Sequence, residues 1–580
     1  MLNSITDKLK TISQHFEKSF DSLSLYLSRI MSGKKGWGIT VAINAFLIAS
    51  GIFLIVFAPH IGPWLGKKSW DSLIYYHDQF LFLGRVLLYA SGIYDLWFYL
   101  FKKKISLQKS LLICALTAGV VLSIDSYCRR TFWGDTMALA AYLKFSSLKE
   151  LLVPGYPNYY LQMAPPGFTF LCKILGVCFG FNKWAMALPS LLFSLGALYC
   201  FKNLARKTLT PWGCTAAMWL FALNPGIWIY AGEFKQYSCD IFFTIFILSA
   251  ATDYAKNEGK YWVKLVFAGL AGLLFSHAMF FVLPSVGVAL LMRYFTCRKH
   301  NSLFIIGIIW FTAVLAMAYY TKVMMPEGMY THEHHVKGFA PIPDSWENIK
   351  WYWTSLTSLF IAPWAMAWGF TLLFIFPFTG MLIGVIKLQK KQFIIVFSAA
   401  VIMLFLYIAS FLQQYSLASG VPFPKGRLIL FTIPPAILIF CGSLRYKIAM
   451  LWVAPVILSL FLHCCTAMIP FGKSEAAVKE LMLNYKQGDQ ICASSNVAKT
   501  AVLLYTPEDI AGKVSFFDLD EFNKVLLTAE YVHILLADLP PDELPIPEGY
   551  TIKQSKSFAF TSVITLQKVN TPTQKNSDQQ

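Results

Sequence analysis

The sequence predicts an all-α polytopic membrane protein with about thirteen transmembrane helices, followed by a small C-terminal α/β domain outside the membrane. Of the 580 residues, 56% are hydrophobic and 14% are charged, whereas soluble globular domains carry about 25% charged residues. Apolar stretches close to the roughly 20 residues that cross a bilayer recur along the chain, and the stretch 39–59 contains no charged residue. This composition excludes a soluble enzyme.

The distribution of charge predicts the orientation in the membrane. The chain has 49 Lys and Arg against 31 Asp and Glu, a net charge of +18. The basic residues form short clusters between apolar runs, as is typical of loops on the cytoplasmic side of a membrane. The expected surroundings are therefore a lipid bilayer, and no nucleic acid is expected as a partner. The clusters are 34–35, 102–104, 202–207, 256–260, 293–299, 387–391 and 445–447.

The alternation of these clusters with apolar runs defines the spans. With a cytoplasmic N-terminus and an external C-terminus, the predicted spans are 39–59, 80–101, 105–124, 185–201, 211–229, 239–256, 262–276, 278–295, 302–320, 364–386, 393–412, 428–444 and 448–469. One further segment, 166–182, is apolar but short. Counting it as a span would place every later basic cluster outside, so we expect it to be re-entrant or interfacial.

The chain divides into five predicted regions. Residues 1–38 form an amphipathic cytoplasmic leader that lacks the early apolar stretch of a signal peptide. Residues 39–104 contain two N-terminal spans. Residues 105–469 form the main transmembrane domain, and its external loops are the expected places for function; they are 125–165, 321–363 and 412–427. A small external α/β domain occupies 470–569, and a disordered polar tail covers 570–580.

The C-terminal domain has its own pattern. Ser474 is predicted to cap a helix that buries Val478, Leu481, Met482 and Tyr485. Strands are predicted at 490–494, 514–519 and 532–537, with a hairpin across 550–569. Most of the 12 Cys residues of the whole chain lie in apolar runs, where they pack as small hydrophobes, so no disulfide framework is expected.

The first external loop contains a candidate catalytic residue, Asp135. It lies just outside the third predicted span in a loop rich in aromatic residues. A carboxylate there suits a general base, which accepts a proton from an acceptor hydroxyl or amine while a leaving group departs. Asp is also a favoured N-cap, so the alternative role of Asp135 is to cap a helix that begins at Thr136. The local sequence alone favours the cap.

A second polar cluster lies at a predicted external boundary of the membrane. Glu233, Lys235, Tyr237 and Asp240 stand close together between two apolar spans. In a helix, Glu233 and Tyr237 would share a face, as would Tyr237 and Asp240. Polar groups near a bilayer are costly unless they face a cavity or one another. The cluster is therefore either part of a site or an internal ion pair that ties two spans together.

Two further features have simple structural interpretations. Arg427 precedes the span 428–444 at a height where its forked guanidinium matches the phosphate of a lipid, but a lone basic residue at a helix end commonly extends to the membrane surface. His332, Glu333, His334 and His335 are adjacent in a polar loop and lack the spacing that converges on one ion. We therefore assign no metal site.

The order of four motifs resembles the GT-C superfamily of membrane glycosyltransferases, in particular bacterial members of the family-39 or 4-amino-4-deoxyarabinose-transferase type. The motifs are Phe132–Asp135 (FWGD), Gln162–Phe168 (QMAPPGF), Gly180–Leu192 (GFNKWAMALPSLL) and Glu233–Asp240 (EFKQYSCD). The resemblance is strongest over 105–300, and the two spans before residue 105 look like an addition to the family core. The chain departs from the family at Ala187, where Arg is frequent, and at Thr136, where a second acid often follows the first.

The resemblance implies a hexosyl- or pentosyltransferase of the bacterial cytoplasmic (inner) membrane. Such an enzyme moves a sugar from a polyprenyl-phosphate donor to an extracytoplasmic acceptor, which is a lipid, glycan or protein. Asp135 matches the catalytic carboxylate of the family. The residues implied to bind the donor phosphate or substrate are Glu233, Lys235, Tyr237, Asp240, Gln162 and, by a looser correspondence, Arg427.

No cofactor is expected with certainty. The chain has no GxxxxGK[ST] loop for nucleotide phosphates, which a lipid-linked donor explains. Thr136 stands where a second acid would assist a metal, so a divalent metal ion is not favoured. Two alternatives remain open: a transporter or lipid flippase, although transporters usually show paired halves with interrupted helices, and an oligosaccharide ligase that uses a diphosphate carrier.

Overall fold

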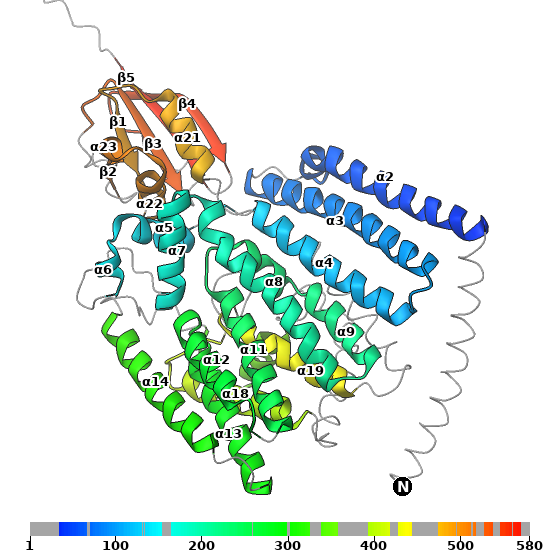
Figure 1. Cartoon of the computed structure of the whole chain (residues 1–580). Helices are drawn as coiled ribbons and strands as arrows, with labels where there is room; N and C mark the ends of the chain where they lie inside the picture. The colour runs from blue at the N-terminus through cyan, green and yellow to red at the C-terminus, as the bar shows by residue number, and fades with distance from the viewer. Residues whose placement is uncertain are drawn as a thin grey trace, which may run out of the picture.

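The computed structural model contains a bundle of helices and a small five-stranded sheet (Figure 1). The residues that it describes are 34–66, 70–129, 131–132, 134–152, 164–257, 259–297, 302–324, 338–357, 392–417, 427–443, 474–494, 496–511, 514–517, 527–537, 544, 546–558 and 561–569. The helices of the bundle and its loops are α2 (Lys34–Trp64), α3 (Trp70–Lys102), α4 (Leu107–Arg129), α5 (Gly134–Phe145), α6 (Leu148–Leu152), α7 (Pro166–Phe179), α8 (Lys183–Thr208), α9 (Pro211–Ala222), α10 (Pro225–Trp228), η1 (Ile229–Gly232), α11 (Tyr237–Lys256), α12 (Trp262–Phe275), α13 (Met279–Cys297), α14 (Ser302–Met324), α16 (Trp346–Thr357), α18 (Phe393–Phe411), η3 (Arg427–Thr432) and α19 (Ile433–Ser443).

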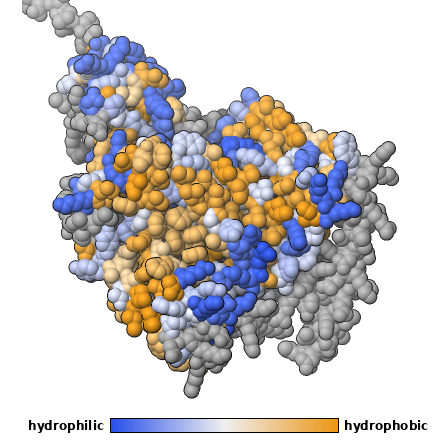
Figure 2. All heavy atoms as spheres, viewed as in Figure 1, coloured by the Kyte–Doolittle hydropathy of each residue, from blue (hydrophilic) through white to orange (hydrophobic). Residues whose placement is uncertain are grey.

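Several of these helices have the length and composition of membrane spans. Within the described residues, seven helices are long and apolar enough to cross a bilayer, or eight if one bent pair counts as a single span. Figure 2 shows hydrophobic residues over much of the helical body and a mostly hydrophilic surface on the C-terminal domain. The chain is thus a multi-pass membrane protein, and the predicted polytopic helical fold with a small C-terminal α/β domain is confirmed.

Some predictions fall on parts of the chain that are not described. These are residues 1–33 of the leader, the spans 364–386 and 448–469, the whole tail 570–580, and the His332–His335 run. Among the described helices, α2 begins at Lys34, so the end of the predicted leader is already helical. α12 has 14 residues, about 21 Å at 1.5 Å per residue, which is shorter than the hydrocarbon core of about 30 Å.

One predicted span, 211–229, is wrong as a continuous helix. α9 ends at Ala222, and the chain bends by 61° before α10 and η1. The Asn224 side chain accepts a hydrogen bond from the Gly226 N–H at 2.9 Å and so caps a new helix. Pro225 follows it and has no N–H with which to continue the α9 hydrogen bonds. The bend therefore places an irregular backbone segment inside the bundle.

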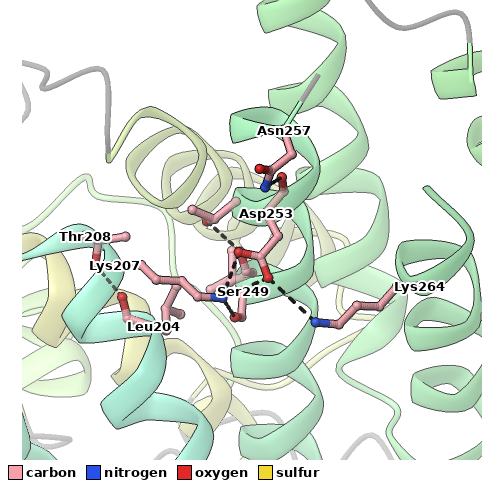
Figure 3. A network of polar contacts seen from close by, with 9 residues as sticks. Leu204, Lys207, Thr208, Ser249, Asp253, Asn257 and Lys264 are labelled. Atoms are coloured by element: carbon pink, nitrogen blue, oxygen red, sulfur yellow. Dashed lines mark hydrogen bonds and ion pairs between the residues drawn. The ribbon is translucent and has the colours of Figure 1, made fainter. Parts of the chain in front are cut away.

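An ion-pair network joins three helices at one end of the bundle (Figure 3). Lys207, in the last turn of α8, contacts both carboxylate oxygens of Asp253 on α11, at 2.7 and 2.8 Å. Lys264, on α12, lies 3.6 Å from the same carboxylate. The last turns of α8 and α11 and the first turn of α12 therefore meet, and we call this the Lys207 end. It follows that α8 begins, and α12 ends, at the opposite end.

The segment 166–182 enters and leaves the bundle from that opposite end. A Cβ on Gly167, near the start of α7, would lie 2.7 Å from the Leu274 carbonyl oxygen near the end of α12. After α7 the chain turns at Gly180 and starts α8 at once, with Asn182 as its N-cap. Both ends of α7 are thus remote from the Lys207 end, in agreement with a re-entrant or interfacial helix.

The C-terminal domain is a mixed sheet with helices on one face. Its helices are α21 (Ser474–Asn484), α22 (Asn496–Tyr505) and α23 (Glu508–Ala511), and its strands are β1 (Gln490–Ala493), β2 (Ser515–Phe516), β3 (Tyr531–Ala537), β4 (Tyr550–Phe558) and β5 (Thr561–Lys568). The strand order is β2-β1-β3-β5-β4, in which β1 pairs parallel with β2 and β3, and β5 pairs antiparallel with β3 and β4. The predicted strands and hairpin are confirmed, as is a helix that begins at Ser474.

The C-terminal domain packs against the end of the bundle that is opposite the Lys207 end. Its helix α22 contacts α5, and the Lys144 ammonium of α5 donates to the Leu504 carbonyl of α22 at 3.3 Å. Figure 1 shows the domain beside α5 and α7. Buried residues of α21, α22 and the sheet belong to the same hydrophobic cluster as the bundle. We call this the α5 end.

These contacts make a testable statement about topology. Because α5 and the C-terminal domain touch, both must lie on the same side of the membrane, and positive loops predict that this side is external. Alkaline phosphatase fused after residue 575 is therefore expected to be active, whereas a fusion after residue 104 is expected to be inactive. A cytoplasmic reporter such as β-galactosidase should give the opposite pattern at both positions.

Two results would contradict the prediction. Equal phosphatase activity at residues 104 and 575 would place both positions on the same side of the membrane, which contradicts the predicted number of crossings between them. An active phosphatase at 104 with an inactive one at 575 would mean that the whole orientation is inverted. Immunoblots of each fusion serve as the control, because a reporter that is degraded gives no information on the side of the membrane.

Candidate functional site

Three segments that are distant in sequence meet at the α5 end through aromatic side chains. Phe132 precedes α5, Phe168 lies in the first turn of α7, and Phe234 lies between η1 and α11. The ring of Phe234 lies 5.9 Å from that of Phe132 and 5.9 Å from that of Phe168, measured between centroids. All three side chains are buried. Three of the four motifs that resemble the GT-C superfamily therefore converge on one aromatic cluster.

The contact between α4 and η1 fixes the position of the backbone just before Phe234. The Ser126 hydroxyl of α4 donates to the Ile229 carbonyl oxygen at 2.9 Å. At Gly232 the two backbones are so close that an added Cβ would lie 2.3 Å from the Ser126 carbonyl oxygen, a distance that no side chain tolerates. Glycine is thus required at position 232 by the close approach of α4 rather than by an unusual backbone angle.

Asp135 lies in the first turn of α5 and is half-buried. The predicted N-cap role of Asp135 is wrong in one detail. α5 begins at Gly134 and not at Thr136, so Asp135 lies inside the first turn and does not cap the helix. A negative charge in a first turn still interacts favourably with the helix dipole. Asp135 follows Phe132 of the aromatic cluster by three residues, so it lies close to the point where the three segments meet.

The far end of α5 is held by a buried cation. Lys173, on α7, donates from its ammonium to the Leu143 carbonyl at 2.6 Å and to the Lys144 carbonyl at 3.4 Å. Lys173 as a whole is only 8% exposed. These carbonyls belong to the last turn of α5, where a cation is favourable because the carbonyl groups have no partners within the helix. Lys173 thereby fixes α5 relative to α7.

The cluster 233–240 is buried, but it is not one continuous helix. Glu233, Lys235, Tyr237 and Asp240 are each 3–6% exposed. η1 ends at Gly232, Glu233 has extended backbone angles, and α11 begins only at Tyr237. The predicted shared face of Glu233 and Tyr237 is therefore wrong, because the helix that would align them is interrupted. Tyr237 and Asp240 do occupy the first turn of α11, three residues apart.

Hydroxyl groups from neighbouring helices hold this interrupted segment. The Ser190 hydroxyl of α8 donates to the Lys235 carbonyl oxygen at 3.0 Å, and the Ser238 hydroxyl donates to the Tyr230 carbonyl oxygen at 2.9 Å. The Tyr230 and Tyr237 rings pack edge to face, with 4.8 Å between centroids. The backbone next to Lys235 is thus held on two sides, and its position is set by tertiary contacts.

Asp240 points to the turn between α12 and α13. Its Oδ1 accepts a hydrogen bond from the Ser276 hydroxyl at 2.6 Å, and both side chains are buried. A buried carboxyl group is costly unless it is hydrogen-bonded. This contact provides a structural role for Asp240, because it ties the start of α11 to the end of α12.

Of the predicted site residues Arg427 and Gln162, the structure describes only the backbone of Arg427. Arg427 begins η3, which packs against α10 and α11; a Cβ on Gly226 would lie 2.7 Å from Leu430. The backbone of Arg427 is thus near the 224–240 region, while its side chain and the whole of Gln162 lie outside the described residues. Among the side chains that are described, no group of three or more His, Cys, Asp or Glu residues could hold a metal ion.

The sequence analysis missed three positions that shape the site: Ser190, Ser276 and Lys173. Each is a single polar residue in an apolar helix or at its end. A polar residue inside a membrane helix is itself a signal, because it needs a partner there. Ser190 also belongs to the Leu-Pro-Ser stretch of the third motif, so the motif marked the position but not the contact.

Comparisons with known proteins give structural similarities only. No family model matches the chain, and no curated protein sequence matches it. Crystal structures of ArnT from Cupriavidus metallidurans are similar in fold, each at 12% identity. The apo form has a TM-score of 0.49 and covers 79% of this chain and 98% of ArnT. The form bound to undecaprenyl phosphate has a TM-score of 0.47 and covers 78% and 97%.

A third structure is more distant. The oligosaccharyltransferase AglB from Archaeoglobus fulgidus, in complex with an inhibitory peptide and a dolichol-phosphate, has a TM-score of 0.42 at 12% identity. The match covers 74% of this chain and 69% of AglB.

Proposed function

We propose that this protein is a membrane glycosyltransferase of the GT-C type. It moves a sugar from a polyprenyl-phosphate donor to an acceptor on the external side of a bacterial cytoplasmic membrane. The observation that carries the proposal is the convergence of Phe132, Phe168 and Phe234. It gathers the motif that ends in Asp135, the motif before α7 and the buried polar segment 233–240 at the end of the bundle where the C-terminal domain packs.

Asp135 is proposed as the general base. The acceptor hydroxyl or amine attacks the anomeric carbon of the donor sugar and forms the new glycosidic bond. Its proton passes to the Asp135 carboxylate, and the bond between the anomeric carbon and the donor phosphate oxygen breaks. The electron pair of that bond leaves with the polyprenyl phosphate. Proton transfer by a positioned side chain typically contributes 10²–10⁴-fold in rate.

Lys235 and Arg427 are proposed to stabilise the departing phosphate. Negative charge grows on this group as its bond to the sugar breaks, and a fixed cation acts most strongly where water is scarce. Lys235 is buried, and its backbone is held by Ser190, so its position costs little reorganisation. Glu233, Tyr237 and Gln162 are proposed to line the substrate site, whereas the contact with Ser276 favours a structural role for Asp240.

The first prediction concerns the base. Replacing Asp135 by Asn keeps the size of the side chain and removes its ability to accept a proton. We expect turnover to fall by at least 10²-fold, while loss of the first-turn charge costs only about 0.3–1 kcal/mol of stability. The measurement is single-turnover transfer from a radiolabelled polyprenyl-phosphate sugar by the purified variant, with its melting temperature compared with that of the wild type.

Glu150→Gln is the matched control. Glu150 is another carboxylate of the same segment. It is half-buried, and the Ser147 N–H and hydroxyl hold the pKa of its carboxyl below the usual range. Because it only caps α6, its loss should leave transfer close to the wild-type rate. Substantial turnover by Asp135→Asn would remove the base from the proposal, and equal losses in both variants would point to disruption of the segment as a whole.

The second prediction concerns the donor. Lys235→Ala removes a buried cation whose partner would be a charged phosphate, and hydrogen bonds to charged groups contribute about 1.5–3 kcal/mol. At about 1.4 kcal/mol per tenfold, we expect one to two decades of loss in donor affinity or turnover. Arg427→Ala should show a similar loss. Arg427→Lys should recover only part of the donor affinity or turnover, since an ammonium lacks the forked pair of N–H groups of a guanidinium.

Steady-state kinetics with donor and acceptor varied separately test this assignment. The dependence on the acceptor should stay near that of the wild type, because the cations act on the phosphate. Wild-type dependence on the donor in both alanine variants would show that these cations do not contact it. Lys207→Ala, which removes a cation from the Lys207 end (Figure 3), controls for a general loss of positive charge.

The third prediction treats Lys173 as a positioning residue. Lys173→Met leaves the last-turn carbonyls of α5 without their cation, so α5 and Asp135 lose a fixed place relative to α7. We expect kcat to fall about tenfold with the KM for the donor nearly unchanged, because binding of the phosphate does not involve α5. Lys173→Arg should restore most of kcat, since a guanidinium also donates to carbonyls. An unchanged kcat in Lys173→Met would refute the positioning role.

A further inference from the structure

A second cluster of charged residues lies outside the site described above, between α3 and α4. Arg85 and Tyr89 belong to α3, in the added N-terminal part, and Asp125 and Arg129 belong to the last two turns of α4. The Tyr89 hydroxyl donates to Asp125 Oδ1 at 2.5 Å, and Arg129 Nε donates to the same oxygen at 2.6 Å. The single carboxylate is thus already matched by a cation from its own helix.

Arg85 is left without an equivalent partner. Its Nε lies 3.6 Å from Asp125 Oδ1, which is longer than a hydrogen bond. The residue is only 9% exposed, and among the residues that the structure describes no acceptor lies within hydrogen-bonding distance of the buried Nε. A buried polar group without a hydrogen bond costs free energy, and a buried charge costs more. The arrangement therefore calls for an additional acceptor.

The nearest groups do not supply one. The guanidinium of Arg85 lies over the Phe82 ring, 5.5 Å from its centroid, and Phe82 stacks on Trp228 with 5.4 Å between centroids. Trp228 Nε1 is a second buried donor for which the described part of the chain provides no acceptor. The other carboxylate on this part of α3 is Asp78, which pairs with His77 at 2.9 Å. Donors thus outnumber acceptors around Arg85.

The cluster lies at the α5 end of the bundle, which the positive loops predict to be external. α4 ends at Arg129, and the Tyr127 hydroxyl beside it donates to the Trp184 carbonyl in the first turn of α8. The side chain of Arg129 is 32% exposed, so a ligand can approach from the membrane surface. This is the depth of lipid headgroups, whose phosphates are the commonest anions there.

We propose that Arg85 and Arg129 form a binding site for a lipid phosphate at the joint between the N-terminal helices and the main transmembrane domain, while Tyr89 stays hydrogen-bonded to Asp125. Two guanidinium groups suit a tetrahedral phosphate, because each guanidinium fork matches two of its oxygens. The phosphate supplies the acceptor that Arg85 lacks. Its source is either a bilayer phospholipid or a free polyprenyl phosphate, and the site is independent of the proposed transfer at Asp135.

Binding of a fluorescent phosphatidylglycerol to the purified full-length protein in neutral detergent micelles tests this site. Arg85→Gln should weaken binding about tenfold to a hundredfold, as expected for the loss of hydrogen bonds to a charged group. Arg85→Lys should recover part of the affinity. Asp125→Asn should act in the opposite direction and strengthen binding several-fold, because it frees Arg129 from its carboxylate. Arg206→Gln, an exposed cation in the last turn of α8 at the Lys207 end, is the matched control and should bind like the wild type.

Competition with unlabelled lipids identifies the source. Displacement by undecaprenyl phosphate at lower concentrations than by phosphatidylglycerol assigns the site to the carrier, and the reverse order assigns it to bilayer phospholipid. Diacylglycerol, which lacks the phosphate, should not compete. Wild-type binding by both Arg85→Gln and Asp125→Asn, or equal competition by diacylglycerol, would overturn the proposal and leave an interhelical ion pair. If Arg85→Gln does not fold, Asp125→Asn decides alone. Transfer activity is not used, so the result is separate from that of the proposed function.

Discussion

The structure depends on one constraint, which is that backbone polar groups inside a bilayer must find partners within the protein. The segment from Asn224 to Gln236 breaks the helical pattern inside the bundle, and side chains satisfy the groups that it frees. Asn224 caps α10, Ser126 donates to Ile229, and Ser190 donates to Lys235. The irregular backbone is tolerated because it is enclosed by protein, and it brings Glu233 and Lys235 into an interior position.

The same enclosure gives the proposed chemistry its electrostatic setting. A cation such as Lys235 acts weakly on a phosphate in bulk water, but much more strongly in a buried and water-poor place. The Ser190 hydroxyl of α8 holds the Lys235 backbone, and the Ser276 hydroxyl just after α12 holds Asp240; neither contact adds charge. The membrane therefore imposes the constraint and also strengthens the interactions that a leaving phosphate needs.

The C-terminal domain is part of this arrangement because it rests on the helix that carries Asp135. α5 is contacted by α22 on one side and by Lys173 of α7 on another. A 12-residue helix between two spans would be marginal on its own, so its stability comes from these tertiary contacts. A domain with an ordinary hydrophilic surface thus supports a residue at the membrane boundary, and the two parts of the chain share one hydrophobic cluster.

The sequence by itself determined the class of fold and the candidate residues, since both follow from local patterns. Apolar length marks the spans, short strand-like runs mark β1 and β3, and the order of the motifs marked Asp135 and the cluster 233–240. The sequence predicted a helix after Asp135, but not its start at Gly134 or its contact with α22. It did not predict the bend at Asn224, which lies in one apolar run. Nor did it predict that Ser190 would meet Lys235, 45 positions away, or that Phe132 and Phe168 would both reach Phe234. Such contacts depend on how the helices pack, and a local pattern contains no information on which distant side chain will satisfy a buried group.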